Sequence, residues 1–156
     1  MTIAASVMNV LEESQAEYQA VAHPRSFSSV ETAMAAHVPE DHIAKGVLLK
    51  DAQGYLLVVI PASQWVDYKR LEDEFDRDLE LATEDEIRRF FDDCALGAIP
   101  PLGRIYGVET VLDESLTSLA YVYFEGGDHE RLVKVSADGF KTLMAGVHRG
   151  HFSNAT

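Results

Sequence analysis

The chain has few of the features that mark secreted or membrane proteins. Its 156 residues include one cysteine, Cys94, which excludes an internal disulfide and suits a reducing compartment. No apolar run approaches the roughly 18 to 20 residues of a membrane span, and the longest, GYLLVVIPA, ends at a proline. The first residues, MTIAASVMNVLEESQ, lack the basic stretch of a signal peptide. We therefore expect a soluble, cytoplasmic protein without a membrane partner.

Basic residues are also scarce. Lys and Arg number 13 against 26 Asp and Glu, which gives a formal net charge of −13. This balance argues against broad, nonspecific binding to nucleic acid, and no DNA partner is expected. Residues 66–93 alone hold twelve acidic and five basic side chains, which predicts a solvated helical face. The rest of the chain can still present a small basic patch.

Signatures of covalent, nucleotide-dependent or metal-dependent catalysis are missing. The sequence has no Gly-x-Ser-x-Gly motif, no phosphate loop and no dinucleotide fingerprint, and Cys94 has no evident base nearby. His148 and His151 have a metal-like spacing but no Cys or Glu partner close in sequence. We expect neither a metal nor a cofactor.

The patterns that are present predict interspersed helices and strands. Helices are expected over residues 2–16, 29–37, 66–76, 83–93 and 136–147, and strands over 16–23, 42–51, 54–62, 79–82, 108–115, 119–127 and 130–136. Capping residues support three helix starts: Ser28 with Glu31, Thr83 with Glu86, and Ser136. Residues 94–107, rich in glycine and proline, are expected to form a loop, and residues 148–156 a flexible tail.

The strands at 42–51 and 54–62 are dense in Val, Leu and Ile, which favours the centre of a sheet. The short segment AQG between them predicts a hairpin. No linker or repeat divides the chain. We therefore expect a single α+β domain over residues 1–156, with a helix within 1–17 and a largely antiparallel or mixed sheet.

Lys45 lies in the middle of an otherwise apolar strand, DHIAKGVLLKD. Alternation places Ile43, Lys45 and Val47 on one face, and an unpaired buried ammonium group costs several kcal/mol. Such a lysine either extends its charged end to solvent at the strand end or faces a cavity that needs the charge, and the sequence leaves both open. Lys50 is expected to reach solvent.

The segment GAIPPLG, residues 97–103, can present backbone amides to a ligand. Its donors are the N–H groups of Gly97, Ala98, Ile99, Leu102 and Gly103, because Pro100 and Pro101 have none. Amides held rigidly in a turn can stabilise an oxyanion, and glycine allows close approach. A plain connecting loop is the alternative.

The segment EGGDH, residues 125–129, follows a predicted strand. Consecutive glycines allow close ligand approach, and Asp128 and His129 supply a carboxylate and an imidazole. A simple turn is the alternative. His23 can line a site in the same way, although a lone histidine at a strand end is more often structural.

Taken in order, these segments resemble a known family. His23-Pro24, then IAKGVLLKD, GYLLVVIPA, LATEDEI, GAIPPLG and YFEGGDH, are similar in order and spacing to the YbaK-type aminoacyl-tRNA deacylases, relatives of the editing domain inserted in bacterial prolyl-tRNA synthetases. The resemblance covers about residues 18–144. It implies a mixed α/β sandwich around a curved, mostly antiparallel sheet, and hydrolysis in trans of the ester in mischarged aminoacyl-tRNA.

The resemblance also implies roles for individual residues. Lys45 would hold the terminal adenosine or its phosphate, and the amides of Gly97, Ala98, Ile99 and Gly103 would bind the ester carbonyl. We then expect Lys45 to face a cavity whose opposite wall is the loop 97–103, with residues 126–129 close by. The remaining segment positions would contact substrate: His23, Gly46, Pro100, Leu102, Gly127, Asp128 and His129. Gly46 stands where relatives often have threonine or asparagine, so we expect a wider pocket there and do not assign the amino acid that is removed.

Three functions stay open at this point. The first is deacylation of mischarged tRNA by a positioned water and a backbone oxyanion site, with docking on a synthetase or elongation factor as a source of affinity. The second is a noncatalytic tRNA- or protein-binding regulatory module of the same fold, which the acidic surface favours. The third is hydrolysis of another small acyl ester or thioester by the same loop.

Overall fold

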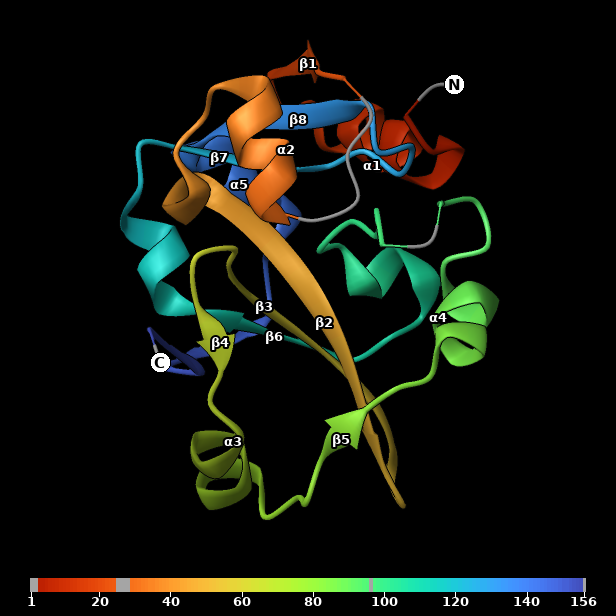
Figure 1. Cartoon of the computed structure of the whole chain (residues 1–156), viewed down its shortest axis with the longest axis vertical. Coiled ribbons are helices and arrows are strands. Elements are labelled where there is room, and N and C mark those ends of the chain that lie inside the picture. Colours follow the sequence, from red (N-terminus) through yellow and green to blue (C-terminus); the bar gives the residue numbers. More distant parts are fainter. Residues whose placement is uncertain (1–2, 25–28, 96, 156) are drawn as a thin grey trace.

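The chain folds around one large sheet, shown in Figure 1. The computed structural model describes residues 3–24, 29–95 and 97–155. Its helices are α1 (Ala5–Ser14), α2 (Ser29–Ala36), α3 (Tyr68–Phe75), α4 (Glu84–Phe90) and α5 (Ala137–Leu143), with 3-10 turns η1 (Glu40–His42), η2 (Gly103–Tyr106) and η3 (Glu114–Ser118). Among the residues described, no helix is long and apolar enough to cross a membrane.

The main sheet is mixed. Its strands are β1 (Tyr18–Ala22), β2 (Ile43–Asp51), β3 (Gly54–Pro61), β6 (Thr110–Asp113), β7 (Tyr121–Glu125), β8 (Arg131–Ser136) and β9 (His148–Gly150), in the order β1-β8-β7-β2-β3-β6-β9, with β5 (Glu80–Leu81) added to β2. The pairs β1–β8, β7–β8, β2–β3 and β2–β5 are antiparallel, whereas β7–β2, β3–β6 and β6–β9 are parallel. The predicted α+β class is confirmed.

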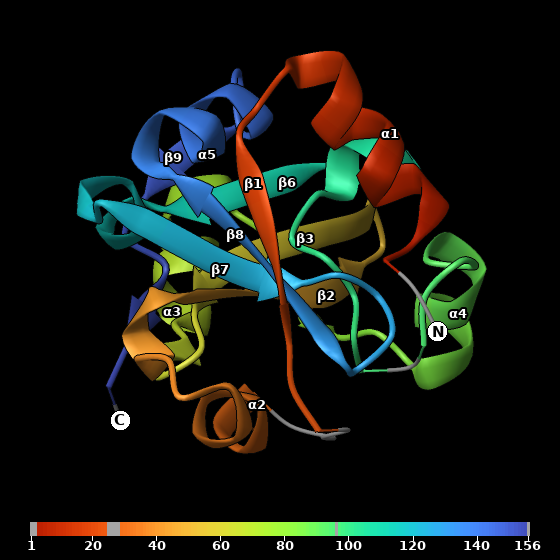
Figure 2. The same cartoon turned by 90° about the horizontal axis from the view of Figure 1, so that it is seen from above.

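Both faces of the sheet are covered, as the apolar density of β2 and β3 predicts. Figure 2 places α1 and α5 on one face and α2 on the other. The first face carries the largest apolar cluster, which includes Leu57, Leu102 and Phe140. On the second face Leu71 of α3 and Ala33 of α2 contribute to two smaller clusters. Apolar side chains therefore pack against both faces of the central hairpin.

The local sequence signals act where they are expected. Thr83 and Glu86 form a complete capping box at the start of α4, and the Ser136 hydroxyl accepts a hydrogen bond from the Gly139 amide. The predicted box at Ser28 lies outside the described residues. The end of the predicted 94–107 loop is not irregular, because Gly103–Tyr106 form η2.

The C-terminal segment 148–156 is expected to be a flexible tail, but its residues 148–154 are built into the fold. Its strand β9 pairs with β6, and β10 (Ser153–Asn154) pairs with β4 (Trp65–Val66). Phe152 is fully buried between the two strands, and its amide donates to the Asp113 carboxylate, which also accepts from the Ser153 hydroxyl. One buried aromatic ring and one buried carboxylate anchor a segment that is otherwise polar.

Candidate functional site

Along one edge of β2 the strand pairing is interrupted in the middle of the strand. β7 pairs with β2 only at Ile43 and Ala44, and β5 pairs with it only at Leu49 and Lys50. Between them, within the described part of the chain, Lys45–Val47 have no strand neighbour on that edge. Figure 1 shows β7 meeting the long β2 near its beginning and β5 near its end. We call this stretch the β2 gap.

Lys45 lies at the start of the β2 gap, on the face that α2 covers. Its side chain is half-buried, with the Nζ atom 3.5 Å from the carbonyl oxygen of Ala62 and 5.7 Å from the centroid of the exposed Trp65 ring. Burial lowers the pKa of Lys45, and the nearby Glu40 carboxylate opposes that shift. No carboxylate in the described residues lies within ion-pair distance of it. Lys45 is therefore a cation available to a ligand.

The loop 97–103 packs on the opposite face of β2, so the expectation that Lys45 faces it directly is wrong. Gly46 is the residue that turns toward the loop. A Cβ atom on Gly46 would lie 3.0 Å from Leu57, and one on Gly103 would also lie 3.0 Å from Leu57. Leu57 thus fills the space beside Gly46, and the expected widening of the pocket at Gly46 is not found.

The loop keeps only some of its amides free. Ala98 donates its N–H to the Ala95 carbonyl, so it is not available to an oxyanion. Pro100, Leu102 and Gly103 are buried and anchor the loop. Gly97 is exposed and Ile99 is partly exposed, and neither amide has an acceptor among the described residues. The amides of Leu102 and Gly103 have no acceptor among the described residues either, but both residues are buried, so Gly97 and Ile99 offer the donors that a ligand can reach.

The segment EGGDH lies beside the start of this loop, as expected. The Ala95 amide donates to the Gly127 carbonyl at 2.7 Å, and Gly127, with φ +113°, packs against Ala4 and Cys94. The Asp128 carboxylate is buried and accepts from the amides of Glu130 and Arg131 and from the Arg131 guanidinium. Asp128 is therefore a turn-forming residue, which corrects its expected role as a substrate contact.

His129 and His23 are both buried on this side of the molecule. His129 adopts a left-handed conformation with φ +62°. The Nδ1 atom of His23 lies 2.8 Å from the Pro24 carbonyl, which can only accept, so Nδ1 carries the proton. Its Nε2 atom is left as an acceptor, and it is buried without a partner.

Glu125 is a candidate site residue that the sequence patterns do not predict. It is the last residue of β7 and follows Phe124, the partner of Ala44, so its side chain lies on the same face as Lys45. Its Oε1 accepts from the Thr32 hydroxyl of α2, whereas its Oε2 is buried without a partner. Burial raises the pKa of Glu125 to about 7, and the Asp128 carboxylate adds to that shift. The available signal was an acidic residue at the end of an apolar strand, directly before two glycines.

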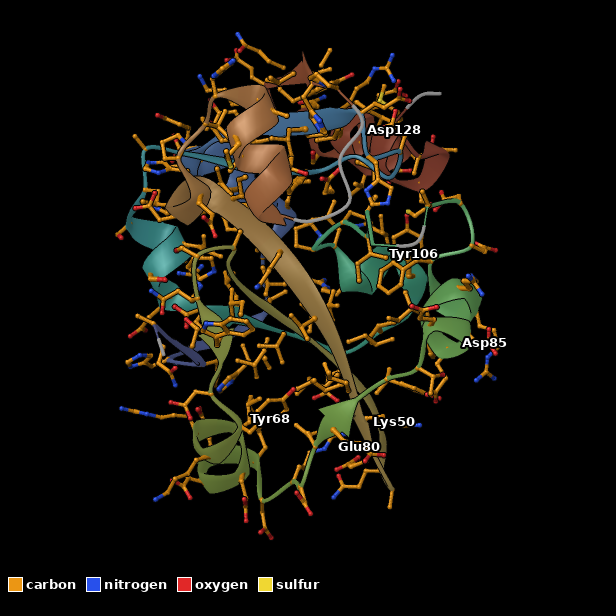
Figure 3. All side chains as sticks on the ribbon, in the orientation of Figure 1. Lys50, Tyr68, Glu80, Asp85, Tyr106 and Asp128 are labelled. Carbon is orange, nitrogen blue, oxygen red and sulfur yellow. The ribbon has the colours of Figure 1, made fainter. Side chains whose placement is uncertain are left out.

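Lys50 is not part of this site. It is expected in solvent, but its Nζ donates to Glu86 at 2.8 Å, and Tyr55 donates to the other oxygen of that carboxylate. Figure 3 places Lys50 and Glu80 at the far end of β2, away from Asp128 and Tyr106.

Tyr106 donates a hydrogen bond to Asp93 and contacts Cys94, and burial raises the pKa of the Cys94 thiol to about 12. No group of three His, Cys, Asp or Glu in the described part of the chain has the geometry to hold a metal ion.

Comparison with known proteins identifies the class of protein that this fold and site define. The model of the aminoacyl-tRNA editing domain matches residues 23–143. The chain therefore belongs to the aminoacyl-tRNA editing domain family, which confirms the resemblance drawn from the sequence. A comparison with curated proteins finds no significant match.

Solved structures agree on the fold. A candidate trans-editing enzyme for prolyl-tRNA synthetase has a TM-score of 0.82 and 22% identity, over 99% of this chain and 98% of that one. The hypothetical protein APE2540 has a TM-score of 0.84 and 20% identity, over 96% and 99%. A candidate signal transduction protein from Marinobacter aquaeolei VT8 has a TM-score of 0.76 and 24% identity, over 97% of this chain but 31% of that one. At these identities the likeness establishes the fold.

Proposed function

We propose that this chain hydrolyses, in trans, the ester that joins a wrongly attached amino acid to tRNA. The observation that carries the proposal, beside family membership, is the cation of Lys45 at the β2 gap. This cation is half-buried and has no carboxylate partner in the described residues. A ligand with a phosphate supplies the missing negative charge and keeps the lysine protonated.

Lys45 and Trp65 together suit the 3′-terminal nucleotide of tRNA. The Trp65 side chain is 66% exposed, which is unusual for a large aromatic residue, and it lies beside the ammonium group. A nucleobase can stack on an exposed indole, while the ammonium group binds the adjacent phosphate or ribose. The acidic chain would then bind tRNA through its end rather than through a broad basic surface.

The ester would lie at the β2 gap. No neighbouring strand there separates the face that carries Lys45 from the face that carries the loop 97–103. The amides of Gly97 and Ile99 would stabilise the developing oxyanion, and a positioned water would attack the carbonyl. A preorganised donor of this kind is typically worth about 3 to 4 kcal/mol of barrier. Aminoacyl esters are activated, so the mechanism does not require a side-chain nucleophile. His129 and Gly127 would border the amino-acid end of the substrate.

The test is a panel of misacylated tRNAs incubated with wild type, Lys45→Ala and a matched control, Lys141→Ala, at an exposed position of α5. Wild type and the control should deacylate at least one member, and Lys45→Ala should reduce that rate at least about 100-fold if the lysine both binds and positions the end of the tRNA. A panel that stays fully charged, with and without added elongation factor, would contradict the proposal. Tight, salt-sensitive tRNA binding without turnover would favour the noncatalytic binding module instead.

A further inference from the structure

Glu125 has a geometry that the fold alone does not explain. Only one of its carboxylate oxygens is used, by Thr32 of α2. The other, Oε2, is buried with no hydrogen-bond partner. Burying a carboxylate with an unused oxygen is costly, and a glutamine could accept the same hydrogen bond from Thr32 without carrying charge. The free oxygen therefore points to a ligand.

The side-chain atoms without hydrogen-bond partners indicate which groups the ligand carries. Two buried side-chain polar atoms lack partners in the described part of the chain, Oε2 of Glu125 and Nε2 of His23. Oε2 is an acceptor when Glu125 is ionised, and Nε2 is an acceptor because Nδ1 carries the proton. They share a face of the sheet: Glu125 is paired with Leu132, Leu132 with Val21, and His23 continues β1 two residues later. Each unsatisfied acceptor favours a ligand group with an N–H donor.

The charges around Glu125 favour a cationic donor. The neighbouring Asp128 is also negative, and its carboxylate is already satisfied by Arg131 and two amides. Lys45 occupies the adjacent position on β2, yet no ion pair joins it to Glu125 among the described residues. When Glu125 is ionised, its negative charge thus has no counterion among the residues that the structure describes.

From this arrangement we infer that Glu125 binds the α-ammonium group of the esterified amino acid, and so restricts the substrate to aminoacyl esters with a free amine. The inference rests on the proposed function. An ammonium group supplies three N–H donors and a positive charge to the vacant acceptor of Glu125. An N-acylated amine has one N–H donor, no charge and extra bulk, which a buried carboxylate disfavours. This recognition does not depend on the side chain of the amino acid, because the α-ammonium group is common to aminoacyl esters.

A consequence follows for the cell's other esters of tRNA. Peptidyl-tRNA and formylated initiator tRNA carry the same ester but no free amine. A deacylase that recognised only the ester and the terminal adenosine would destroy them. A buried carboxylate that binds the free α-ammonium group would exclude peptidyl-tRNA and formylated initiator tRNA without contacting the tRNA body. These two differ from aminoacyl-tRNA at the α-nitrogen, which is acylated.

The experiment compares wild type, Glu125→Gln and a control, Glu114→Gln, at an exposed position of η3. Glutamine keeps the oxygen that accepts from Thr32 and removes only the charge. The substrate is a misacylated tRNA that wild type deacylates, with its amine either free or N-acetylated. Glu125→Gln should lower kcat/KM for the free amine by about 10- to 100-fold, mainly through KM, as expected for a hydrogen bond between charged groups. The rate on the N-acetylated tRNA should not fall, so the preference for the free amine collapses.

Binding measurements distinguish a failure of this inference from a failure of the proposed function. The stable amide analogue 3′-alanylamino-3′-deoxyadenosine and its N-acetyl form are titrated calorimetrically into the same three proteins, and the melting temperatures of the variants establish that they fold. Wild type should prefer the free amine, and Glu125→Gln should lose that preference. If the preference survives in Glu125→Gln, or wild type has none, the inference is overturned even where deacylation is observed. If the preference depends on Glu125 but no tRNA is deacylated, the inference stands and catalysis is what fails.

Discussion

The ammonium nitrogen of Lys45 lies 5.7 Å from the centroid of the Trp65 ring, on the face of β2 opposite the loop 97–103. The two residues come from elements that do not pair with each other, β2 and the short β4, and β4 is held by β10. The contact therefore depends on the C-terminal segment of the chain. A site that binds the end of a nucleic acid needs both a charge and a flat surface, and this contact provides the two together.

The first prediction concerns Trp65. Replacing it with alanine should weaken binding of tRNA, or of a CCA trinucleotide, by about 1 to 3 kcal/mol, the usual contribution of one stacked base. Stability should change little, because the ring is 66% exposed. Titration of a fluorophore-labelled RNA measures the affinity, because Trp65 is the only tryptophan in the sequence. Tyr68→Ala, at another exposed aromatic residue three positions on, is the control and should bind like wild type. Equal affinities for all three proteins would argue against stacking on Trp65.

The second prediction concerns the two glycines on either side of Leu57. A Cβ atom on Gly103 would collide with the Thr110 hydroxyl and lie 3.2 Å from the Val108 carbonyl, whereas one on Gly46 would meet only the Leu57 side chain. Gly103→Ala should therefore lower the free energy of unfolding by about 1 to 3 kcal/mol, the usual cost of overpacking, and Gly46→Ala by less. Urea denaturation of both variants measures this order. The reverse order would mean that the Leu57 side chain cannot move.

The third prediction concerns acid stability. Asp51 accepts two hydrogen bonds from Arg77, at 2.7 and 2.8 Å, and these lower the pKa of Asp51 to about 2. A carboxyl group whose pKa is lower in the folded state stabilises the fold above its unfolded value, near 4, and loses that contribution as the pH falls toward 2. Asp51→Asn should thus be less stable than wild type at pH 7, and the difference should shrink between pH 4 and pH 2.

Urea midpoints across that pH range measure the effect of Asp51→Asn. Asp85→Asn is the control, because Asp85 pairs with Arg88 on the exposed face of α4 and such pairs contribute little. A difference between Asp51→Asn and wild type that stayed constant down to pH 2 would mean that the hydrogen bonds to Arg77 do not depend on the charge of Asp51.

The fourth prediction concerns Phe152. The side chain is fully buried, so Phe152→Ala should lower the free energy of unfolding by about 3 to 5 kcal/mol, the usual cost of removing a buried phenyl ring. His151→Ala, at the exposed neighbour, should have little effect. Thermal unfolding of both variants provides the comparison. If the two melting temperatures were equal, the segment 148–156 would be dispensable for stability, as a flexible tail would be.

Sequence patterns predicted the elements that depend on neighbouring residues. The hairpin of β2 and β3, the capping box of Thr83 with Glu86 and the Ser136 cap are all found, because each is fixed within a few residues of chain. Alternation along β2 also separated Lys45 from Gly46 correctly. Alternation could not determine which loop covers which face of β2. For that reason the expectation that Lys45 faces the loop 97–103 is wrong.

The features that were missed depend on contacts between distant segments. The burial of Phe152 requires the pairing of β10 with β4 and of β9 with β6, and a single phenylalanine in a polar segment does not predict it. Glu125 is significant only because Thr32, Lys45 and His23 lie around it, and these four residues come from four separate elements or their ends. Such convergence has no local pattern.

The pairing of β1 with β8 has a consequence for the order in which the protein takes shape. Tyr18–Ala22 find their partners in residues 131–135, and within the described chain no other strand adjoins β1. During synthesis β1 therefore stays unpaired until β8 has been made, and such a long-range pairing folds slowly and leaves the strand exposed. His23 follows β1 directly and reaches its buried position only with that closure. The buried position of His23 on the same face as Glu125 thus forms only after residues 131–135 have been made, and a chain released before residue 131 would lack it.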